Sequence, residues 1–283
     1  MIELGKKQKL LVVKTVDFGI YLGEDRNAPQ NERVLLPSKQ VPEGTKAGDE
    51  IEVFIYKDSQ DRLIATTREP MLQVGQTAVL KVKQVTRIGA FLDWGLEKDL
   101  LLPFKQQTRK VKTGEQVLAA LYIDKSGRLC ATMNVYEHLR TDSPNKKDDK
   151  VTGRIYEISK NFGAFVAVDN CFSGLIPKKE LFGDTELRIG DQVTARVVKV
   201  LEDGKLTLSV REKAYLQIQK DAEKIERLLD SYEGSLPFND KAAPEVIAHE
   251  TGMSKNEFKR AVGHLLKEGK IQITEKNIRR VRG

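Results

Sequence analysis

The sequence contains little of what stabilises secreted, metal-bound or membrane-spanning proteins. It has two cysteines and no CxxC pair, which argues against a disulfide framework and a zinc site. Three scattered histidines are too few for a metal cluster, so we expect no metal and no cofactor. The longest apolar runs, such as Leu10–Val13, are far too short to cross a bilayer, and no secretion signal follows the N-terminal lysines. We therefore expect a cytoplasmic protein that does not bind membranes.

Catalytic motifs are also missing. There is no GxSxG and no HExxH. Residues 263–270 partly resemble a phosphate-binding loop. Five residues lie between their two glycines, however, and that motif requires four. Strand alternation places Cys130 facing outward, with nothing beside it to activate the thiol. The sequence therefore predicts a protein that is not an enzyme.

The composition indicates a folded protein with a mild positive charge. The chain has 283 residues, of which 40% are hydrophobic and 31% charged, and its formal net charge is +7. Length alone suggests two domains of ordinary size. An anionic partner fits the charge, but so small an excess does not establish one.

A threefold repeat organises the first 210 residues. Gly19, Gly89 and Gly163 mark the same point in each copy, so the offsets are 70 and 74 residues. Apolar residues alternate with a period of two within short segments rich in valine, isoleucine and threonine. Five such strands in about 70 residues favour a small closed barrel, because closure removes exposed sheet edges.

The repeat and a later change of period predict the domain organisation. The predicted segments are barrels at 1–70 and 71–140, a polar flexible linker at 141–150, a barrel at 151–213 and a helical domain at 214–283. The first two barrels are expected to join more tightly, through about 69–75.

Alternation along the second strand of each repeat directs an aromatic ring away from the barrel core. These rings belong to Tyr21, Phe91 and Phe165. A cation recurs before the last strand, as Arg62, Arg128 and Lys205. A ring that stacks on a base beside a cation that meets a phosphate is typical of single-stranded nucleic-acid binding. The alternative is that the rings cover a neighbouring domain or loop.

The motif FGAFV, followed by GLIP, GDQVTARVVKV and GKLTLS, resembles the S1 RNA-binding domain, an OB-fold barrel. The resemblance implies RNA contacts by both aromatics of FGAF and by the cation before the last strand. The matching positions are Phe18, Tyr21 and Arg62 in the first repeat, Phe91 and Arg128 in the second, and Phe162, Phe165 and Lys205 in the third. Ile88 replaces one aromatic, and Asp58 and Asp124 match the aspartate that the family pairs with its arginine. Proline replaces the family's histidine at Pro37, Pro103 and Pro177, so that contact does not carry over.

Charge differs between the repeats. Residues 1–70 carry 11 basic and 12 acidic side chains, residues 71–140 carry 11 and 6, and residues 141–210 carry 11 and 11. Because phosphate contacts dominate affinity for nucleic acids, we expect the second and third barrels to form the main RNA surface. The first barrel is expected to be a packing or auxiliary domain.

The last seventy residues have helical periodicity. An apolar stripe is formed by Tyr215, Ile218, Ala222, Ile225, Leu228 and Leu229. A short helix is predicted from Ala243 to Glu250, and Ser254 with Glu257 forms a capping box for a second helix that runs to about Lys267. Its core face is predicted to be Phe258, Val262, Leu265 and Leu266. Residues 270–274 and 277–283 form two strands of a wing, so this domain resembles a winged helix-turn-helix.

The second helix and the wing are strongly basic. Residues 255–283 carry 9 basic and 3 acidic side chains, a local charge of +6. The candidate nucleic-acid contacts are Lys255, Asn256, Lys259, Arg260, Lys267, Arg279 and Arg280. Such a helix can enter a DNA major groove. The alternative is a winged helix used for protein contacts or as a structural cap.

Three S1-like barrels followed by a winged helix resemble the conserved virulence factor B family over essentially the full chain. That resemblance implies a non-catalytic RNA-binding regulator that influences virulence factor production. The predicted fold is multidomain and mainly β, with three five-stranded OB-fold barrels and an α+β winged helix. The expected partner is single-stranded RNA, with DNA or another protein as alternatives at the winged helix, and the chain is expected to be a monomer. Two other functions stay open, namely a DNA-binding transcription regulator led by the winged helix and a protein-interaction adaptor.

Overall fold

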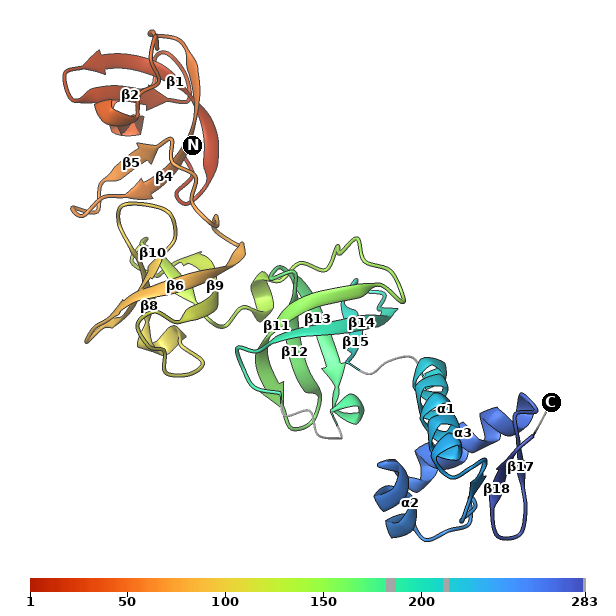
Figure 1. Cartoon of the computed structure of the whole chain (residues 1–283). Coiled ribbons are helices and arrows are strands. Elements are labelled where there is room, and N and C mark those ends of the chain that lie inside the picture. The colour runs from red at the N-terminus through yellow and green to blue at the C-terminus, as the bar shows by residue number, and fades with distance from the viewer. Residues whose placement is uncertain (182–186, 211–213, 282–283) are drawn as a thin grey trace. The chain divides into compact units, whose positions relative to one another are not determined.

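The computed structural model describes residues 1–181, 187–210 and 214–281, with side chains omitted at 214–217. The chain divides into two compact units, Met1–Val210 and Arg211–Gly283 (Figure 1). Three predictions lie outside the described residues: the domain ends at 213 and 283 and the side chain of Tyr215. The first unit is mainly β and the second mixes helices and strands, so the predicted fold class is confirmed.

The first unit contains three sets of five strands, here called barrels 1, 2 and 3. Barrel 1 consists of β1 (Lys7–Val16), β2 (Gly19–Gly23), β3 (Val34–Pro37), β4 (Glu50–Lys57) and β5 (Leu63–Thr66). Barrel 2 consists of β6 (Thr77–Val85), β7 (Gly89–Asp93), β8 (Leu100–Pro103), β9 (Gln116–Ile123) and β10 (Leu129–Thr132). Barrel 3 consists of β11 (Lys150–Ser159), β12 (Gly163–Val168), β13 (Phe172–Pro177), β14 (Gln192–Val200) and β15 (Leu206–Ser209).

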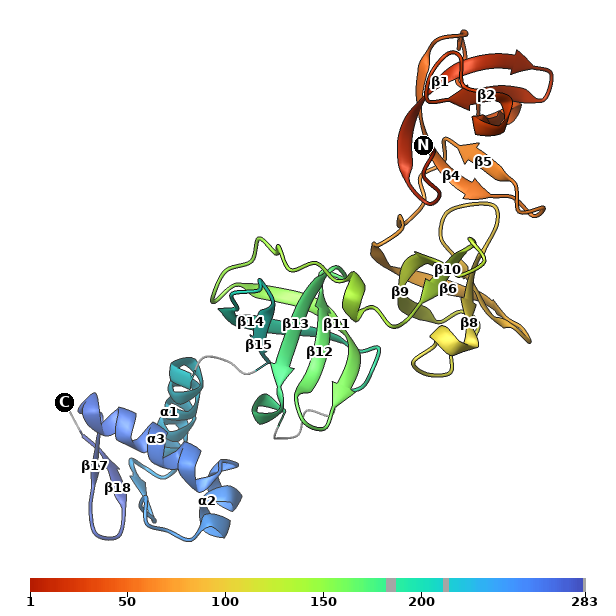
Figure 2. The ribbon, with the colours of Figure 1, turned by 180° about the vertical axis from the view of Figure 1, so that it is seen from behind.

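The barrels share one topology. Barrel 1 closes in the order β1-β2-β3-β5-β4 and barrel 3 in the order β11-β12-β13-β15-β14, while barrel 2 is a five-stranded sheet in the order β10-β9-β6-β7-β8, with β10 and β8 at its two edges. Figure 2 shows β11, β12 and β13 side by side, as their antiparallel pairing requires. The alternation predicted for the strands is confirmed, because Val193, Ala195 and Val197 are all buried in the core of barrel 3.

The repeated glycine begins the second strand of each barrel for a steric reason. Gly19, Gly89 and Gly163 have φ angles of +152°, +149° and +122°. A Cβ atom there would lie 2.1–2.3 Å from a carbonyl oxygen of the third strand. Only glycine permits this conformation and this close approach of two backbones. The repeated glycine therefore marks a close approach of the second and third strands. The residue just before it, such as Phe18, lies in the turn.

Barrels 1 and 2 share a hydrophobic cluster. Phe54 and Tyr56 alternate with the core residues of β4 and so point away from barrel 1, yet both are buried. They belong to the same cluster as the core of barrel 2, and the Phe54 ring meets the Trp94 ring edge-on at 5.7 Å. Lys6 Nζ also donates to the Val74 carbonyl at 2.9 Å. The two barrels thus bury apolar surface against each other.

The segment between barrels 2 and 3 packs on both of them. A short 3₁₀ helix, η4 (Tyr136–His138), is flanked by the buried side chains of Val135 and Leu139. Residues 141–150, predicted to be a flexible linker, make several contacts with barrel 3. The Asp148 amide donates to the Val197 carbonyl at 2.7 Å, and the Arg196 guanidinium lies 3.1 Å from the Asp148 carboxylate.

The second unit has three helices and a small sheet among its described residues. The helices are α1 (Ala214–Ser231), α2 (Pro244–Thr251) and α3 (Lys255–Lys267), and β16 (Ser235–Leu236), β18 (Ile278–Arg280) and β17 (Ile271–Ile273) form the sheet in that order. The predicted capping box of Ser254 and Glu257 is confirmed at the start of α3. The prediction for Leu266 was wrong: its side chain is 46% exposed, because the core face of α3 runs through Phe258, Ala261, Val262 and Leu265.

No helix in the described ranges is long and apolar enough to cross a membrane.

Candidate nucleic-acid interface

Each barrel presents a repeated pair of side chains on its outer surface. One lies in the turn between the first and second strands, and the other lies in the second strand. The turn residues Phe18, Ile88 and Phe162 are 57%, 60% and 63% exposed. The strand residues Tyr21, Phe91 and Phe165 are only half-buried and lie outside the barrel cores. The predicted outward direction of the strand rings is therefore confirmed, but the turn residue offers the larger free surface.

Barrel 3 carries the largest group of rings. Phe165 meets the Phe162 ring at 6.4 Å, the Tyr136 ring at 6.0 Å and the Tyr156 ring at 6.1 Å between centroids. Tyr136 comes from η4, outside the barrel strands, and is 43% exposed. The Lys205 ammonium lies 5.6 Å from the centre of the Tyr136 ring, which is a favourable cation–π distance. We call Tyr136, Phe162, Phe165 and Lys205 the ring cluster.

Phe165 also covers a neighbouring part of the protein, which was the alternative considered for the outward rings. It packs against a buried cluster of Leu118, Ala120, Val135, Leu139, Tyr156 and Ala167, to which barrels 2 and 3 both contribute. Its neighbours Phe162 and Tyr136 are the more exposed rings. At this position the sequence pattern thus combines a packing ring with a ring available to a ligand.

The three predicted cations are held in different ways. In barrel 1, Arg62 donates from Nε and Nη2 to Asp58 Oδ2 at 2.9 and 2.8 Å. Burial alone would raise the pKa of the Asp58 carboxyl, but hydrogen bonds from Arg62 outweigh it and lower that pKa. This bidentate pair already occupies the guanidinium, so Arg62 is the least available of the three for a phosphate.

The cations of barrels 2 and 3 have fewer contacts with carboxylates than Arg62 has. Arg128 Nε donates to Ser126 Oγ at 2.9 Å, and within the described residues no carboxylate lies at ion-pair distance from its guanidinium. Asp124 instead accepts from the Ser126 hydroxyl and from the Arg128 amide, bonds that lower its pKa. In barrel 3, Lys205 Nζ lies 2.9 Å from Asp203 Oδ2, an exposed pair of small energetic value.

A recess of about 480 Å³ lies beside the outward ring of barrel 2. Phe91, Arg128 and Leu101 line it from barrel 2, and Lys57 and Ser59 line it from the β4–β5 side of barrel 1. We call this space the barrel 2 recess. It brings two predicted RNA contacts, Phe91 and Arg128, into one concave site.

Cys130 lines the same recess, so its predicted outward direction is confirmed. Its side chain points away from the barrel core, but the residue is only 4% exposed. Burial raises the pKa of the Cys130 thiol to about 11, with the Asp124 carboxylate adding to the effect. At neutral pH the side chain is therefore a protonated, unreactive thiol.

The predicted contacts of the winged helix divide into free and engaged side chains. Asn256, Lys259, Arg260, Lys267 and Arg279 are exposed. Arg280 is engaged, because it lies 2.7 Å from the Asp230 carboxylate and donates to the Glu226 carbonyl at 3.0 Å. Lys255 is half-buried beside the Lys241 carbonyl at 3.5 Å. The exposed basic surface is thus centred on the middle and end of α3 and on β18.

No group of histidine, cysteine or acidic side chains suited to a metal ion occurs among the residues that the structure describes.

Sequence reasoning missed Tyr136 and Lys57. Tyr136 lies after the last strand of barrel 2, where the repeat has ended, and no pattern links it to barrel 3. Lys57 ends a strand of barrel 1, and only the packing of Phe54 and Tyr56 on barrel 2 brings it to the recess. Neither position has a local signal that could have identified it.

Comparisons with known proteins match every part of this architecture. S1 domain models match residues 4–68 and 74–134, and the S1 RNA binding domain matches residues 145–211. The CvfB-like winged helix domain matches residues 223–279. A conserved virulence factor B of Staphylococcus haemolyticus is 31% identical over 272 residues, which cover 89% of this chain and 90% of that protein. The chain belongs to the conserved virulence factor B family.

Two further proteins resemble the chain over most of its length. The protein YitL of Bacillus subtilis is 34% identical over 282 residues, covering 94% of this chain and 90% of that protein. A crystal structure of a Streptococcus pneumoniae protein, described as a multidomain protein with nucleic acid binding domains, is 26% identical with a TM-score of 0.48 and covers 98% of both chains. The domains of the present family member are of nucleic-acid-binding types.

Proposed function

We propose that this protein is a non-catalytic regulator that binds single-stranded RNA through the outer faces of its barrels, assisted by the basic winged helix, and thereby influences gene expression, including virulence factor production. The ring cluster of barrel 3 carries the proposal. Phe162 is an exposed ring, and Tyr136, also exposed, has the ammonium of Lys205 over its ring. Stacking on such rings suits unpaired bases, because bases in a duplex already stack on each other.

Charge supports a contribution from barrel 2 and from the winged helix. The Arg128 guanidinium lies in the barrel 2 recess without a carboxylate partner in the described chain. Lys259, Arg260 and Lys267 are exposed along α3. Several cations on separate surfaces would contact phosphates of one strand and raise the affinity through linked sites.

Binding to single-stranded RNA and to duplex DNA at several salt concentrations tests this function. We expect the full chain to prefer single-stranded RNA, with an affinity that falls linearly with salt on logarithmic axes. A preference for duplex DNA would instead support a transcription regulator led by α3. Absence of binding to either nucleic acid would support a protein-interaction adaptor.

A further inference from the structure

The β4–β5 loop of barrel 1 lies beside the outward ring of barrel 2, Phe91. Lys57, Ser59 and Asp61 of this loop line the barrel 2 recess together with Phe91 and Arg128. A recess of about 480 Å³ is within the range of about 300–1,000 Å³ typical of small-ligand sites. One barrel therefore supplies the stacking ring, and its neighbour supplies part of the wall.

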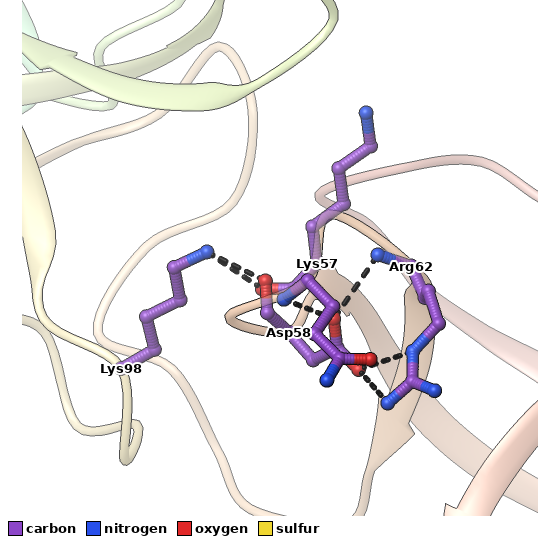
Figure 3. A network of polar contacts seen from close by, with 5 residues as sticks. Lys57, Asp58, Arg62 and Lys98 are labelled. Carbon is purple, nitrogen blue, oxygen red and sulfur yellow. Dashed lines mark hydrogen bonds and ion pairs between the residues drawn. The ribbon is translucent and has the colours of Figure 1, made fainter.

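A network of hydrogen bonds holds the loop in this position (Figure 3). Lys98 Nζ of barrel 2 donates to the Asp58 carbonyl at 2.7 Å and to the Lys57 carbonyl at 3.3 Å. From the other side, Arg62 and the Gln60 amide donate to the Asp58 carboxylate. Phe54, in the strand that leads into the loop, is buried against Trp94, so polar and apolar contacts both hold this part of barrel 1 on barrel 2.

The recess has the chemistry of a nucleotide site. Phe91, Leu101 and Leu129 give it apolar walls, on one of which a base can stack. Its lining includes the cations of Lys57, Lys98 and Arg128. It also includes three carboxylates, of which Asp99 is paired with Lys83 and Asp124 accepts from Ser126 and the Arg128 amide. A methyl group placed on Gly127 would lie 3.6 Å from Lys57 Nζ, so Lys57 reaches the β9–β10 loop that carries Arg128. Within the described residues Lys57 has no ion pair.

We infer that the barrel 2 recess binds one unstacked nucleotide of single-stranded RNA, with its base against Phe91 and its phosphate between Lys57 of barrel 1 and Arg128 of barrel 2. This inference rests on the proposed RNA-binding function and extends it. Barrel 1 then takes part in RNA binding through its β4–β5 loop. Its own cation, Arg62, serves to hold Asp58 and the loop.

The test compares two lysines of barrel 1 in the full chain. Lys57→Ala removes the cation at the recess, and Lys46→Ala removes an exposed lysine that does not line it. Affinity for a fluorescein-labelled, mixed-sequence, single-stranded oligoribonucleotide is measured by anisotropy at constant salt. We expect Lys57→Ala to weaken binding about tenfold, as for loss of a charged hydrogen bond, and Lys46→Ala about twofold or less. A second variant, Ser59→Glu, should also weaken binding because it places a carboxylate beside the phosphate.

A double-variant cycle shows whether Lys57 and Arg128 hold the same phosphate. We expect the effects of Lys57→Ala and Arg128→Ala to be non-additive, because residues that share a partner are coupled. Equal effects of Lys57→Ala and Lys46→Ala, in a chain that still loses affinity with Phe162→Ala, would overturn this inference and leave the proposed function standing. No RNA binding by the unaltered chain would overturn both.

Discussion

In barrel 2 the outward ring Phe91 lines a recess that a loop of barrel 1 also lines. In barrel 3 the corresponding Phe165 instead contacts the rings of Tyr136 and Phe162. The turn residues differ in the same sense, since Ile88 has no ring and Phe162 is an exposed aromatic. Barrel 2 thus offers a concave site in which the Arg128 guanidinium donates to Ser126 and has no carboxylate at ion-pair distance among the described residues. Barrel 3 offers a group of rings with a lysine above one of them.

The surroundings of the repeated position account for this difference. Barrel 1 directly precedes barrel 2, and its β4–β5 loop lines the barrel 2 recess, where Lys98 donates to the Asp58 carbonyl. Barrel 3 receives η4 and its Tyr136 from the segment that follows barrel 2. A repeated motif therefore sets which side chain points outward, and the adjoining segment decides whether that side chain lines a recess or joins a cluster.

The largest expected effect is on stability, and it concerns the apolar contact between barrels 1 and 2 beside the barrel 2 recess. Trp94 is 2% exposed, its indole N–H donates to the Lys98 carbonyl at 2.6 Å, and its ring packs on Phe54. We expect Trp94→Ala to lower the free energy of unfolding by about 3–5 kcal/mol, the usual cost of emptying such a site. Urea unfolding followed by circular dichroism measures it. A loss below about 1 kcal/mol would show that the barrels do not depend on this contact.

The next effect is the dependence of stability on pH through Cys130. Burial raises the pKa of its thiol to about 11, above the ordinary value of a free thiol. The folded chain holds this proton more tightly than the unfolded chain, so the contribution is complete below pH 9 and is lost as the pH rises towards 11. We expect a loss of about 2 kcal/mol across this interval.

Cys130→Thr provides the control for this pH effect, because barrel 3 has Thr207 at the corresponding position. The variant keeps every other titrating group, including Cys171. The difference between the two unfolding curves, measured in urea from pH 8 to 11, isolates the Cys130 thiol. Curves with identical pH dependence would show that the recess does not shield it.

A smaller effect compares the two turn residues in RNA binding. We expect Phe162→Ala to weaken binding of single-stranded RNA by about 1–3 kcal/mol, because a stacking ring is lost. Ile88→Ala should cost less than about 1 kcal/mol, since an aliphatic side chain has no π-face to stack on a base. Anisotropy titrations of the two full-length variants under one buffer measure both losses. Equal losses would mean that the ring at Phe162 contributes only apolar surface.

The smallest effect contrasts two buried hydroxyl groups. Tyr156 of barrel 3 is 6% exposed and its hydroxyl has no hydrogen-bond partner among the residues that the structure describes, while Thr132 of barrel 2 donates to Gln106 at 2.7 Å. We expect Tyr156→Phe to leave stability unchanged or raise it by up to about 1 kcal/mol. Thr132→Val should lower it by about 1 kcal/mol, because Gln106 loses one of its donors and the Asn134 amide loses its acceptor. A clear loss in Tyr156→Phe would indicate a bridging water.

Much of the barrel fold could be predicted from the sequence, since it depends on local signals. The glycines at 19, 89 and 163 mark strand crossings where a Cβ atom would clash, and period-two alternation separates core from surface. Ser254 with Glu257 marks the start of α3 in the same local way. Such features need only a few neighbouring residues to be recognised.

The composition of the candidate site could be predicted only in part. Phe91 and Arg128 follow from the repeat, but Lys57 reaches the recess because Phe54 and Tyr56 pack on barrel 2. Cys130 points outward, as strand alternation predicts, yet the residue is only 4% exposed. Contacts between repeats depend on surfaces distant in sequence, and a period of about 70 residues does not encode them.

The central claim is that RNA lies on the outer faces of the barrels. Photo-crosslinking of the full chain to thiouridine-containing single-stranded RNA, with mass-spectrometric location of the linked peptides, tests it most directly. We expect crosslinks in peptides that contain Phe91 and in those that contain Tyr136 or Phe162, and fewer with Phe162→Ala. Crosslinks confined to residues 223–279, with none on the barrels, would contradict the account.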